Sequence, residues 1–328
     1  MNAAAVALAY KQCERITRDR ARNFYYGIRL LPPRQRSAMC ALYAMARRID
    51  DVGDGPASDG TSAVSPRHDG PRHDGPRYDG PRHDGPAHGE QTVERRLSAL
   101  RDVKTSLELL ANAAGEGTPA AAAPPGDPVL TALADAASAF PLPMGAFLEL
   151  VEGCEWDIAG RRYETFEELV GYCRRVAGTI GRLSLAIYGS SDGPTAEPLA
   201  DALGVGLQLT NILRDLIEDR DVMGRVYLPR DDLARFAVGA DLAGRPDDIV
   251  ALICFETGRA AEWYDRGMAL LPLLDKRSRA CTAAMTGIYR RVLDKIRVDP
   301  ESVLHGRVSL STGEKLTVAA RALATGAA

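Results

Sequence analysis

Apolar residues recur along this chain at intervals of three and four, which is the period of an α-helix. Strand-like alternation is hard to find, and β-branched residues are scarce. We therefore expect an all-α fold in which residues 1–328 form a single domain, with helices packed around a central cavity. The pattern predicts helices at residues 3–20, 36–53, 91–112, 129–139, 144–158, 166–188, 194–218, 247–271 and 277–295.

Two low-complexity stretches interrupt this pattern. Residues 66–85 repeat the unit PRHDG, with one PRYDG, and trail off as PAHGE. A Pro and a Gly in every five residues exclude helix and sheet, and no apolar side chain is available to bury. We expect a disordered insert at about 56–90, and a flexible loop at about 111–128, where Ala, Gly and Pro dominate. The insert holds four of the five histidines, so histidine-based catalysis and histidine-rich metal centres are nearly excluded.

Composition limits the classes of function. Hydrophobic residues make up 45% of the chain and charged residues 26%, with a net charge of -3, which suits a large core and argues against nucleic-acid binding. The six cysteines show no CxxC spacing and are expected to be buried and reduced. No cleavage-like site follows the N-terminus, and no apolar run approaches about 18 residues. We expect a cytoplasmic protein, with peripheral contact with a bilayer left open.

The segment Asp201–Asp219, DALGVGLQLTNILRDLIED, carries a polar stripe on a mainly apolar helix. Gln208, Asn211, Asp215 and Asp219 follow one another by three, four and four residues, within an arc of roughly 80°. A helix that is apolar almost all round is buried, and buried polar side chains need partners. The stripe is expected to line an interior cavity that holds ions or a polar ligand; the alternative is a partly solvated amphipathic helix.

A second acidic turn ends the helical pattern of residues 37–54. Asp50 and Asp54 lie on one helical face, and such like charges repel, so a cation is expected to neutralise them. Arg47 precedes Asp50 by three residues and Asp51 by four. It can pair with a carboxylate or reach a phosphate bidentately. Together the two acidic turns are typical of the two walls of a magnesium–diphosphate site, although a solvated helix end is the plainer interpretation of either alone.

Three segments resemble the signature blocks of the squalene/phytoene synthase family: FYYGIRLLPPRQRSAMCALYAMARRIDDVGD (Phe24–Asp54), YCRRVAGTIGRL (Tyr172–Leu183) and GLQLTNILRDLIEDRDVMGRVYLP (Gly206–Pro229). They occur in the family's order, and the likeness covers most of residues 10–55 and 91–315. FYYGIRLLP and GCEWDIAGRRYETFEEL most resemble bacterial presqualene diphosphate synthases of the hopanoid and squalene route. The resemblance implies the helical isoprenoid synthase fold. It also implies a head-to-head (1'-1) condensation of two farnesyl diphosphates to presqualene diphosphate, through Mg2+-dependent ionisation and cyclopropane formation.

The resemblance also implies roles for individual residues. The implied metal ligands are Asp50, Asp51, Asp54, Asp215, Asp219 and Asn211. The implied diphosphate-binding residues are Arg47, Arg214 and Arg225, with Gln208 assisting. Hard oxygen ligands suit Mg2+, with Mn2+ as an alternative. The expected apolar lining is Phe24, Tyr43, Val176, Ala177, Leu207 and Ile212.

Other residues are given two interpretations. Tyr43, Tyr172 and Tyr289 are candidates for stabilising a carbocation or handling a proton, or are packed core tyrosines. Gly178 and Gly181 either thin the helix so that substrate approaches closely, or allow tight helix packing.

Several alternatives stay open. Phytoene synthase, acting on two geranylgeranyl diphosphates, uses the same chemistry, because cavity depth sets chain length. A squalene synthase would add an NADPH step; the chain lacks a GxGxxG fingerprint, but so do family members that use NADPH. A di-iron bundle needs ExxH pairs, which this chain does not supply. A non-enzymatic helical scaffold with the repeat as a binding arm leaves the polar stripe unexplained. Downstream isoprenoid enzymes are further candidate partners.

Overall fold

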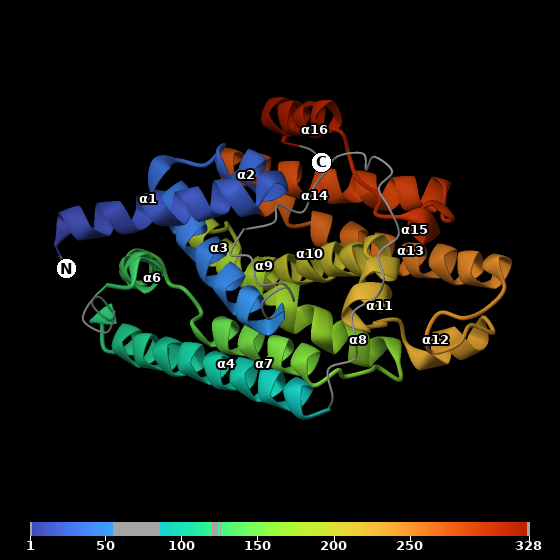
Figure 1. The fold of residues 1–328 in the computed structure, drawn as a ribbon. Helices are drawn as coiled ribbons and strands as arrows, with labels where there is room; N and C mark the ends of the chain where they lie inside the picture. The colour runs from blue at the N-terminus through green and yellow to red at the C-terminus, as the bar shows by residue number, and fades with distance from the viewer. Residues whose placement is uncertain (1, 55–85, 120–123, 125, 327–328) are drawn as a thin grey trace.

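The computed structural model describes residues 2–54, 86–119, 124 and 126–326. Within these ranges the chain forms helices and no strand, which confirms the expected all-α fold (Figure 1). The helices are α1 (Ala3–Arg20), α2 (Arg22–Ile28), α3 (Pro33–Asp54), α4 (Pro86–Gly115), α6 (Pro128–Ala139), α7 (Gly145–Ile158), α8 (Phe166–Cys173), α9 (Thr179–Tyr188), α10 (Gly193–Arg214), α11 (Leu216–Met223), α12 (Arg230–Arg235), α13 (Pro246–Met268), α14 (Lys276–Val298), α15 (Ser302–His305) and α16 (Thr312–Thr325). The π-helical turn η1 (Arg174–Gly178) joins α8 to α9, and the 3-10 turn η2 (Leu271–Leu273) precedes α14.

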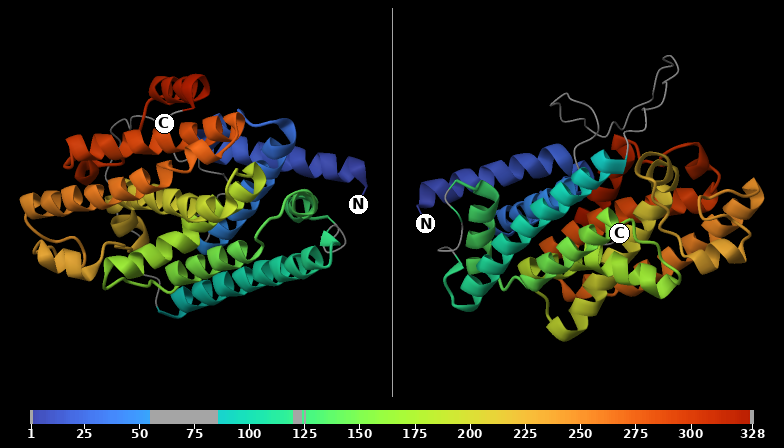
Figure 2. Two further views of the ribbon diagram at one scale, coloured as in Figure 1. Left: turned by 180° about the vertical axis from the view of Figure 1, so that it is seen from behind. Right: turned by 60° about the horizontal axis from the view of Figure 1, so that its bottom comes forward.

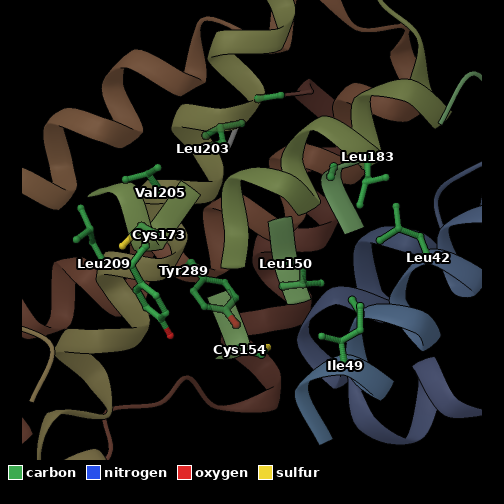
Figure 3. Close-up of a cluster of buried hydrophobic side chains, with 14 of the residues drawn as sticks. Leu42, Ile49, Leu150, Cys154, Cys173, Leu183, Leu203, Val205, Leu209 and Tyr289 are labelled. Atoms are coloured by element: carbon green, nitrogen blue, oxygen red, sulfur yellow. The ribbon is translucent and has the colours of Figure 1, made fainter. Parts of the chain in front are cut away.

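Helix α10 lies at the centre of the molecule and packs against α9, α13 and α14. In Figures 1 and 2, α14 and α16 form one side, α4 and α7 the opposite side, and α10 runs between them. One apolar core extends from α1 to α16, and Figure 3 shows part of it, with side chains from α3, α7, α9, α10 and α14. The single-domain organisation stays a prediction, which this continuous core supports.

Two predicted helices are interrupted where candidate site residues lie. The expected helix 194–218 ends at Arg214 and resumes at Leu216, because Asp215 leaves helical geometry with φ -100° and ψ 11°. The expected helix 166–188 contains the π-helical turn η1. Such turns are rare and frequently mark functional sites. Neither interruption contains a proline from which it could be predicted.

The boundaries of the low-complexity stretches differ from the prediction. Helix α4 begins at Pro86, inside the stretch assigned to the insert, with Pro in the first turn where its missing N–H costs nothing. It continues to Gly115, into the predicted loop, because ANAA is a good helix-forming run. Residues 55–85, 120–123 and 125 lie outside the described residues, and the disorder prediction for the repeat falls among them.

Other differences concern the surface and the C-terminus. Helix α16 was not anticipated, although the Ser311 and Glu314 side chains form a capping box at its start. Cys254 is exposed, whereas the other cysteines are buried and all are free thiols. Within the described part of the chain, no helix has both the length and the apolar composition needed to cross a membrane.

Candidate active site

A cavity of about 240 Å3 runs between α2, α3, α9, α10 and α14. Most of its lining is apolar, and its charged and amide side chains gather at one end: Arg47, Asp50, Gln208 and Asn211. Of the expected apolar lining, Phe24, Tyr43, Val176, Ala177 and Leu207 line the cavity. Ile212 does not; it is buried in the core beside it, because it lies on another face of α10.

Two threonines of α14 also face the cavity without making it polar. The Thr282 hydroxyl donates to the Ser278 carbonyl at 2.9 Å, and the Thr286 hydroxyl donates to the Thr282 carbonyl at 2.6 Å. Both hydroxyl protons are therefore engaged by the helix itself.

The acidic turn of α3 divides its carboxylates between two surfaces. Asp50 lines the cavity, whereas Asp51 is exposed on an outer cleft and forms an i,i+4 ion pair with Arg47. Arg47 borders both spaces. Asp54 is the last residue of α3, and its side chain lies outside the described residues. The adjacent carboxylates predicted as equivalent ligands thus have different surroundings.

The second acidic turn is held by two arginines. The Arg214 side chain donates to Asp215 in bidentate fashion, with Nε 2.9 Å from Oδ1. The guanidinium of Arg307, from the segment after α15, lies 3.0 Å from the same oxygen. Burial disfavours the Arg214 charge, but Asp215 and Tyr289 outweigh it and raise the Arg214 pKa. This turn therefore concentrates positive charge around one buried carboxylate.

Tyr43 lines the cavity, whereas Tyr289 does not and packs behind Phe24 of the lining. The Tyr289 ring lies 5.8 Å from the Arg214 guanidinium and stacks on Phe24 with ring centroids 5.5 Å apart. Burial raises the pKa of Tyr43 to about 12, so its hydroxyl stays protonated at neutral pH. Both tyrosines keep the cation-stabilising role as a prediction.

Asp219 lies one helical turn after Asp215, in α11, and Arg225 lies in the loop that follows α11. The Asp219 N–H donates to the Asp215 carbonyl at 2.8 Å, which preserves helical spacing across the break. The Arg225 N–H donates to the Asp219 carbonyl at 2.9 Å. Neither side chain is part of the cavity lining, so their roles as ligand and diphosphate-binding residue stay predictions.

The donors at the polar end fit a hard metal ion. The side-chain oxygen of Asn211 is buried and without a hydrogen-bond partner, while its amide donates to Gln208 at 3.3 Å. Buried polar atoms normally have partners, so this oxygen is available as a ligand beside Asp50. In the described part of the chain, no three His, Cys, Asp or Glu side chains could hold a metal alone. Mg2+ commonly uses one or two carboxylates and completes its shell with water and phosphate oxygens.

The glycines of the VAGTIG segment allow close packing of α9 against α10. A Cβ on Gly178 would lie 2.3 Å from an Asp201 carboxylate oxygen, and one on Gly181 would lie 2.2 Å from the Ala200 carbonyl. Gly181 also lines the cavity, as do Val176 and Ala177 of η1. Gly178 does not line it, so the packing interpretation accounts for Gly178, and both interpretations fit Gly181.

Tyr172 lies outside the cavity lining in a cluster of tyrosines. Its hydroxyl donates to Asp157 at 2.8 Å, and Tyr227 donates to the other oxygen of Asp157 at 3.1 Å. The Tyr172 ring stacks on Tyr227 at 5.3 Å and contacts Tyr163 at 5.4 Å. This cluster joins α7 and α8 to the loop that carries Arg225, and the catalytic role of Tyr172 stays a prediction.

The sequence patterns do not identify Arg307 or Asp157 as candidate site residues. The tripeptide GRV of the third motif, Gly224–Val226, occurs again at Gly306–Val308, which is a local sequence signal for Arg307. Asp157 is a single acid in a helical segment, and its role depends on tyrosines from two other elements.

The geometry is that of an apolar helical cavity with Asp50, Arg47 and the unpaired Asn211 oxygen at one end. Asp215 and its two arginines do not line the cavity, but the Asp215 N–H donates to the Asn211 carbonyl at 2.9 Å. The squalene/phytoene synthase family matches residues 17–314. The chain belongs to the squalene/phytoene synthase family. Enzymes of this family are prenyltransferases that condense prenyl diphosphates head to head. As a member of the family, the protein is a prenyltransferase of this type.

Several relatives within the family are similar over nearly the whole chain. The phytoene synthase of Mycobacterium tuberculosis is 43% identical over 323 residues, which are 97% of this chain and 91% of the relative. The 15-cis-phytoene synthase of a Synechocystis species is 34% identical, covering 95% of this chain and 84% of the relative.

Two solved structures show the same fold. A dehydrosqualene synthase in complex with a ligand superimposes with a TM-score of 0.73 at 25% identity, covering 96% of this chain and 95% of that one. A squalene synthase from Alicyclobacillus acidocaldarius gives a TM-score of 0.69 at 27% identity, covering 90% of this chain and 96% of that one. These similarities confirm the isoprenoid synthase fold expected for the family.

Proposed function

We propose that the protein condenses two molecules of geranylgeranyl diphosphate head to head to phytoene. The observation that carries the choice of substrate is the 43% identity, over 97% of the chain, to a relative named phytoene synthase. The sequence motifs favoured farnesyl diphosphate and presqualene diphosphate, with phytoene synthesis as the alternative. The relatives support the alternative better, because the Mycobacterium tuberculosis and Synechocystis proteins are both named phytoene synthases.

The residues of the polar end suit the binding of diphosphate with its metal. Asp50, Asp215 and the Asn211 oxygen would hold Mg2+, and Asp51, Asp54 and Asp219 remain candidate ligands. When bound, Mg2+ neutralises the diphosphate and makes it a better leaving group. Arg214 and Arg307 now pair with Asp215. Once Asp215 faces a cation, both guanidinium groups are free to bind phosphate oxygens bidentately.

The apolar walls suit the allylic cation left by ionisation. Water would capture such a cation, and the mainly apolar lining offers water few hydrogen-bond partners. The Phe24 and Tyr43 side chains are aromatic groups of this wall, and aromatic faces stabilise cations. Attack by the double bond of the second chain, followed by loss of a proton, forms the cyclopropane intermediate, and loss of its diphosphate and a second proton gives phytoene.

Competition between substrates tests the choice of chain length. The purified protein is given equimolar farnesyl and geranylgeranyl diphosphates with Mg2+, and the hydrocarbon and diphosphate products are identified by mass. We expect C40 phytoene as the main product, formed without NADPH. Presqualene diphosphate as the main product would restore the farnesyl assignment, and squalene formed only with NADPH would indicate a reductive enzyme.

A further inference from the structure

The cavity has a polar end and a closed end. On α3 the lining runs from Asp50 to Met39, on α10 from Asn211 to Ala200, and along η1 and α9 from Val176 to Tyr188. At 1.5 Å per residue, the spans on α3 and α10 are each about 16 Å. A prenyl chain whose diphosphate lies at the polar end therefore extends toward the end where Tyr188 lies.

Tyr188 closes that end with the largest side chain there. It is the last residue of α9, is buried, and lines the cavity. Its hydroxyl lies 3.3 Å from the Cys281 sulfur of α14, which fixes the ring from behind. Leu185, Leu270 and Thr282 complete the same region of the lining.

The backbone under Tyr188 is also held in place. The Gln35 amide of α3 donates to the Ile187 carbonyl at 3.1 Å and to the Tyr188 carbonyl at 3.3 Å. These are carbonyls that a helix end leaves without an intrahelical partner. Gly189 follows with φ +70°, so the chain turns away at once. The ring is thereby anchored from α3 and α14.

The side walls of the cavity differ from its floor, which is the closed end formed by Tyr188. Met39 and Met285 line the cavity, and methionine adapts its shape easily because it is unbranched and flexible. The cavity volume of about 240 Å3 lies below the roughly 300–1,000 Å3 usual for ligand sites. Binding a long chain therefore requires side chains to move, and the walls can give way where the anchored floor cannot.

We propose that Tyr188 is the residue that sets the maximum length of the prenyl chain. The inference rests on the proposed function, since it assigns one residue to the choice of substrate length. The hydrocarbon tail of the accepted substrate ends against the Tyr188 ring. Removal of the ring adds its volume to the closed end, and a longer chain then fits.

The test compares Tyr188→Ala with Tyr188→Phe. Each variant receives C15, C20 and C25 all-trans prenyl diphosphates separately, and kcat/KM and product length are measured. We expect Tyr188→Ala to raise the C25:C20 ratio of kcat/KM about 10-fold or more, as hydrophobic pockets discriminate by chain length. Tyr188→Phe keeps the ring and loses only the hydroxyl, so its ratio should stay within about 2-fold of the original.

Two further variants keep the result interpretable. Leu107→Ala removes a fully buried side chain of α4 that does not line the cavity; it lowers stability and should leave the ratio unchanged. Ala200→Leu fills the closed end and should shift preference toward C15, even if Tyr188→Ala fails to fold. If the C25:C20 ratio is unchanged in Tyr188→Ala and the preference is unchanged in Ala200→Leu, while the original protein still forms phytoene, Tyr188 does not set chain length. The proposed function would then still stand. No condensation product from the original protein would overturn the proposed function as well.

Discussion

The guanidinium of Arg307 lies 3.0 Å from the carboxylate of Asp215, which brings a residue of the C-terminal segment against the second acidic turn. Because Arg214 pairs with the same carboxylate, Asp215 is shared between two cations. We interpret this arrangement as a preformed group of diphosphate-binding residues that Asp215 holds in place.

Arg307→Gln should lower kcat/KM by about 10- to 100-fold, since hydrogen bonds to charged groups contribute roughly 1.5–3 kcal/mol. The change removes a cation beside the leaving diphosphate. Arg291→Gln, an exposed arginine of α14, is the matched control and should leave kcat/KM unchanged. Equal losses in both variants would argue for a general charge effect and against a specific role of Arg307.

Asp50 and Asp51 should respond differently to the same substitution. Asp50→Asn alters a carboxylate of the cavity and is expected to reduce turnover by about 100-fold or more, as loss of a preorganised electrostatic group does. Asp51→Asn alters a side chain on the outer cleft that pairs with Arg47, and its loss should be about 10-fold or less. The dependence of rate on Mg2+ concentration in each variant checks this order. The reverse order would show that the outer carboxylate is the principal ligand.

Tight contact between α9 and α10 should make Gly181 intolerant of a side chain. A Cβ there would meet the Ala200 carbonyl at 2.2 Å, so Gly181→Ala should destabilise the fold by about 3 kcal/mol, the upper range for overpacking. Gly258 of α13 has nothing within 4 Å of such a Cβ. Gly258→Ala should therefore stabilise the fold by up to about 1 kcal/mol. Thermal unfolding of the two variants separates the effect of close packing from that of helix propensity. A Gly181→Ala variant more stable than the original protein would contradict the close contact between α9 and α10.

Stability should depend on pH through Glu256. Burial raises its pKa from 4.5 to about 7, with Arg259 opposing and Asp232 adding to the shift. The folded state thus holds a proton that the unfolded state has lost between about pH 4.5 and 7. The free energy of unfolding should fall as pH rises through this window, by about 3 kcal/mol from this group. Glu256→Gln should flatten that decline and be more stable than the original protein at pH 8. Denaturant titrations at pH 5 and 8 measure both effects, and parallel curves for the two proteins would show that Glu256 ionises normally.

The helices and the first half of the polar stripe, Gln208 and Asn211, could be predicted because both are local patterns, whereas Asp215 and Asp219 do not line the cavity. Gln208 and Asn211 reach the cavity because a buried helix of 3.6 residues per turn places them on one face. The break at Asp215 could not be predicted in this way, since NILRDLIED contains neither Gly nor Pro. At that position the carboxylate is held by Arg307 from another part of the fold, and tertiary contacts override helix propensity.

Local patterns also could not predict the cavity floor at Tyr188 or the tyrosine cluster around Asp157. Tyr188 becomes the end of the cavity only because Gln35 and Cys281, from α3 and α14, meet it there. Asp157 acquires two tyrosine hydroxyls from α8 and from the loop after α11. Helical periodicity identifies which face of each helix is buried, but not which residue of another helix it meets.

Phytoene synthesis by this protein is tested by identifying the product that the purified protein makes from geranylgeranyl diphosphate and Mg2+ without a reductant. We predict phytoene, identified by mass and by its ultraviolet spectrum, with formation abolished by chelation of the metal and by Asp50→Asn or Asp215→Asn in variants that keep their helical circular dichroism. Full phytoene formation in both variants would contradict the assignment of the site. The absence of any condensation product from either geranylgeranyl or farnesyl diphosphate would contradict the account as a whole.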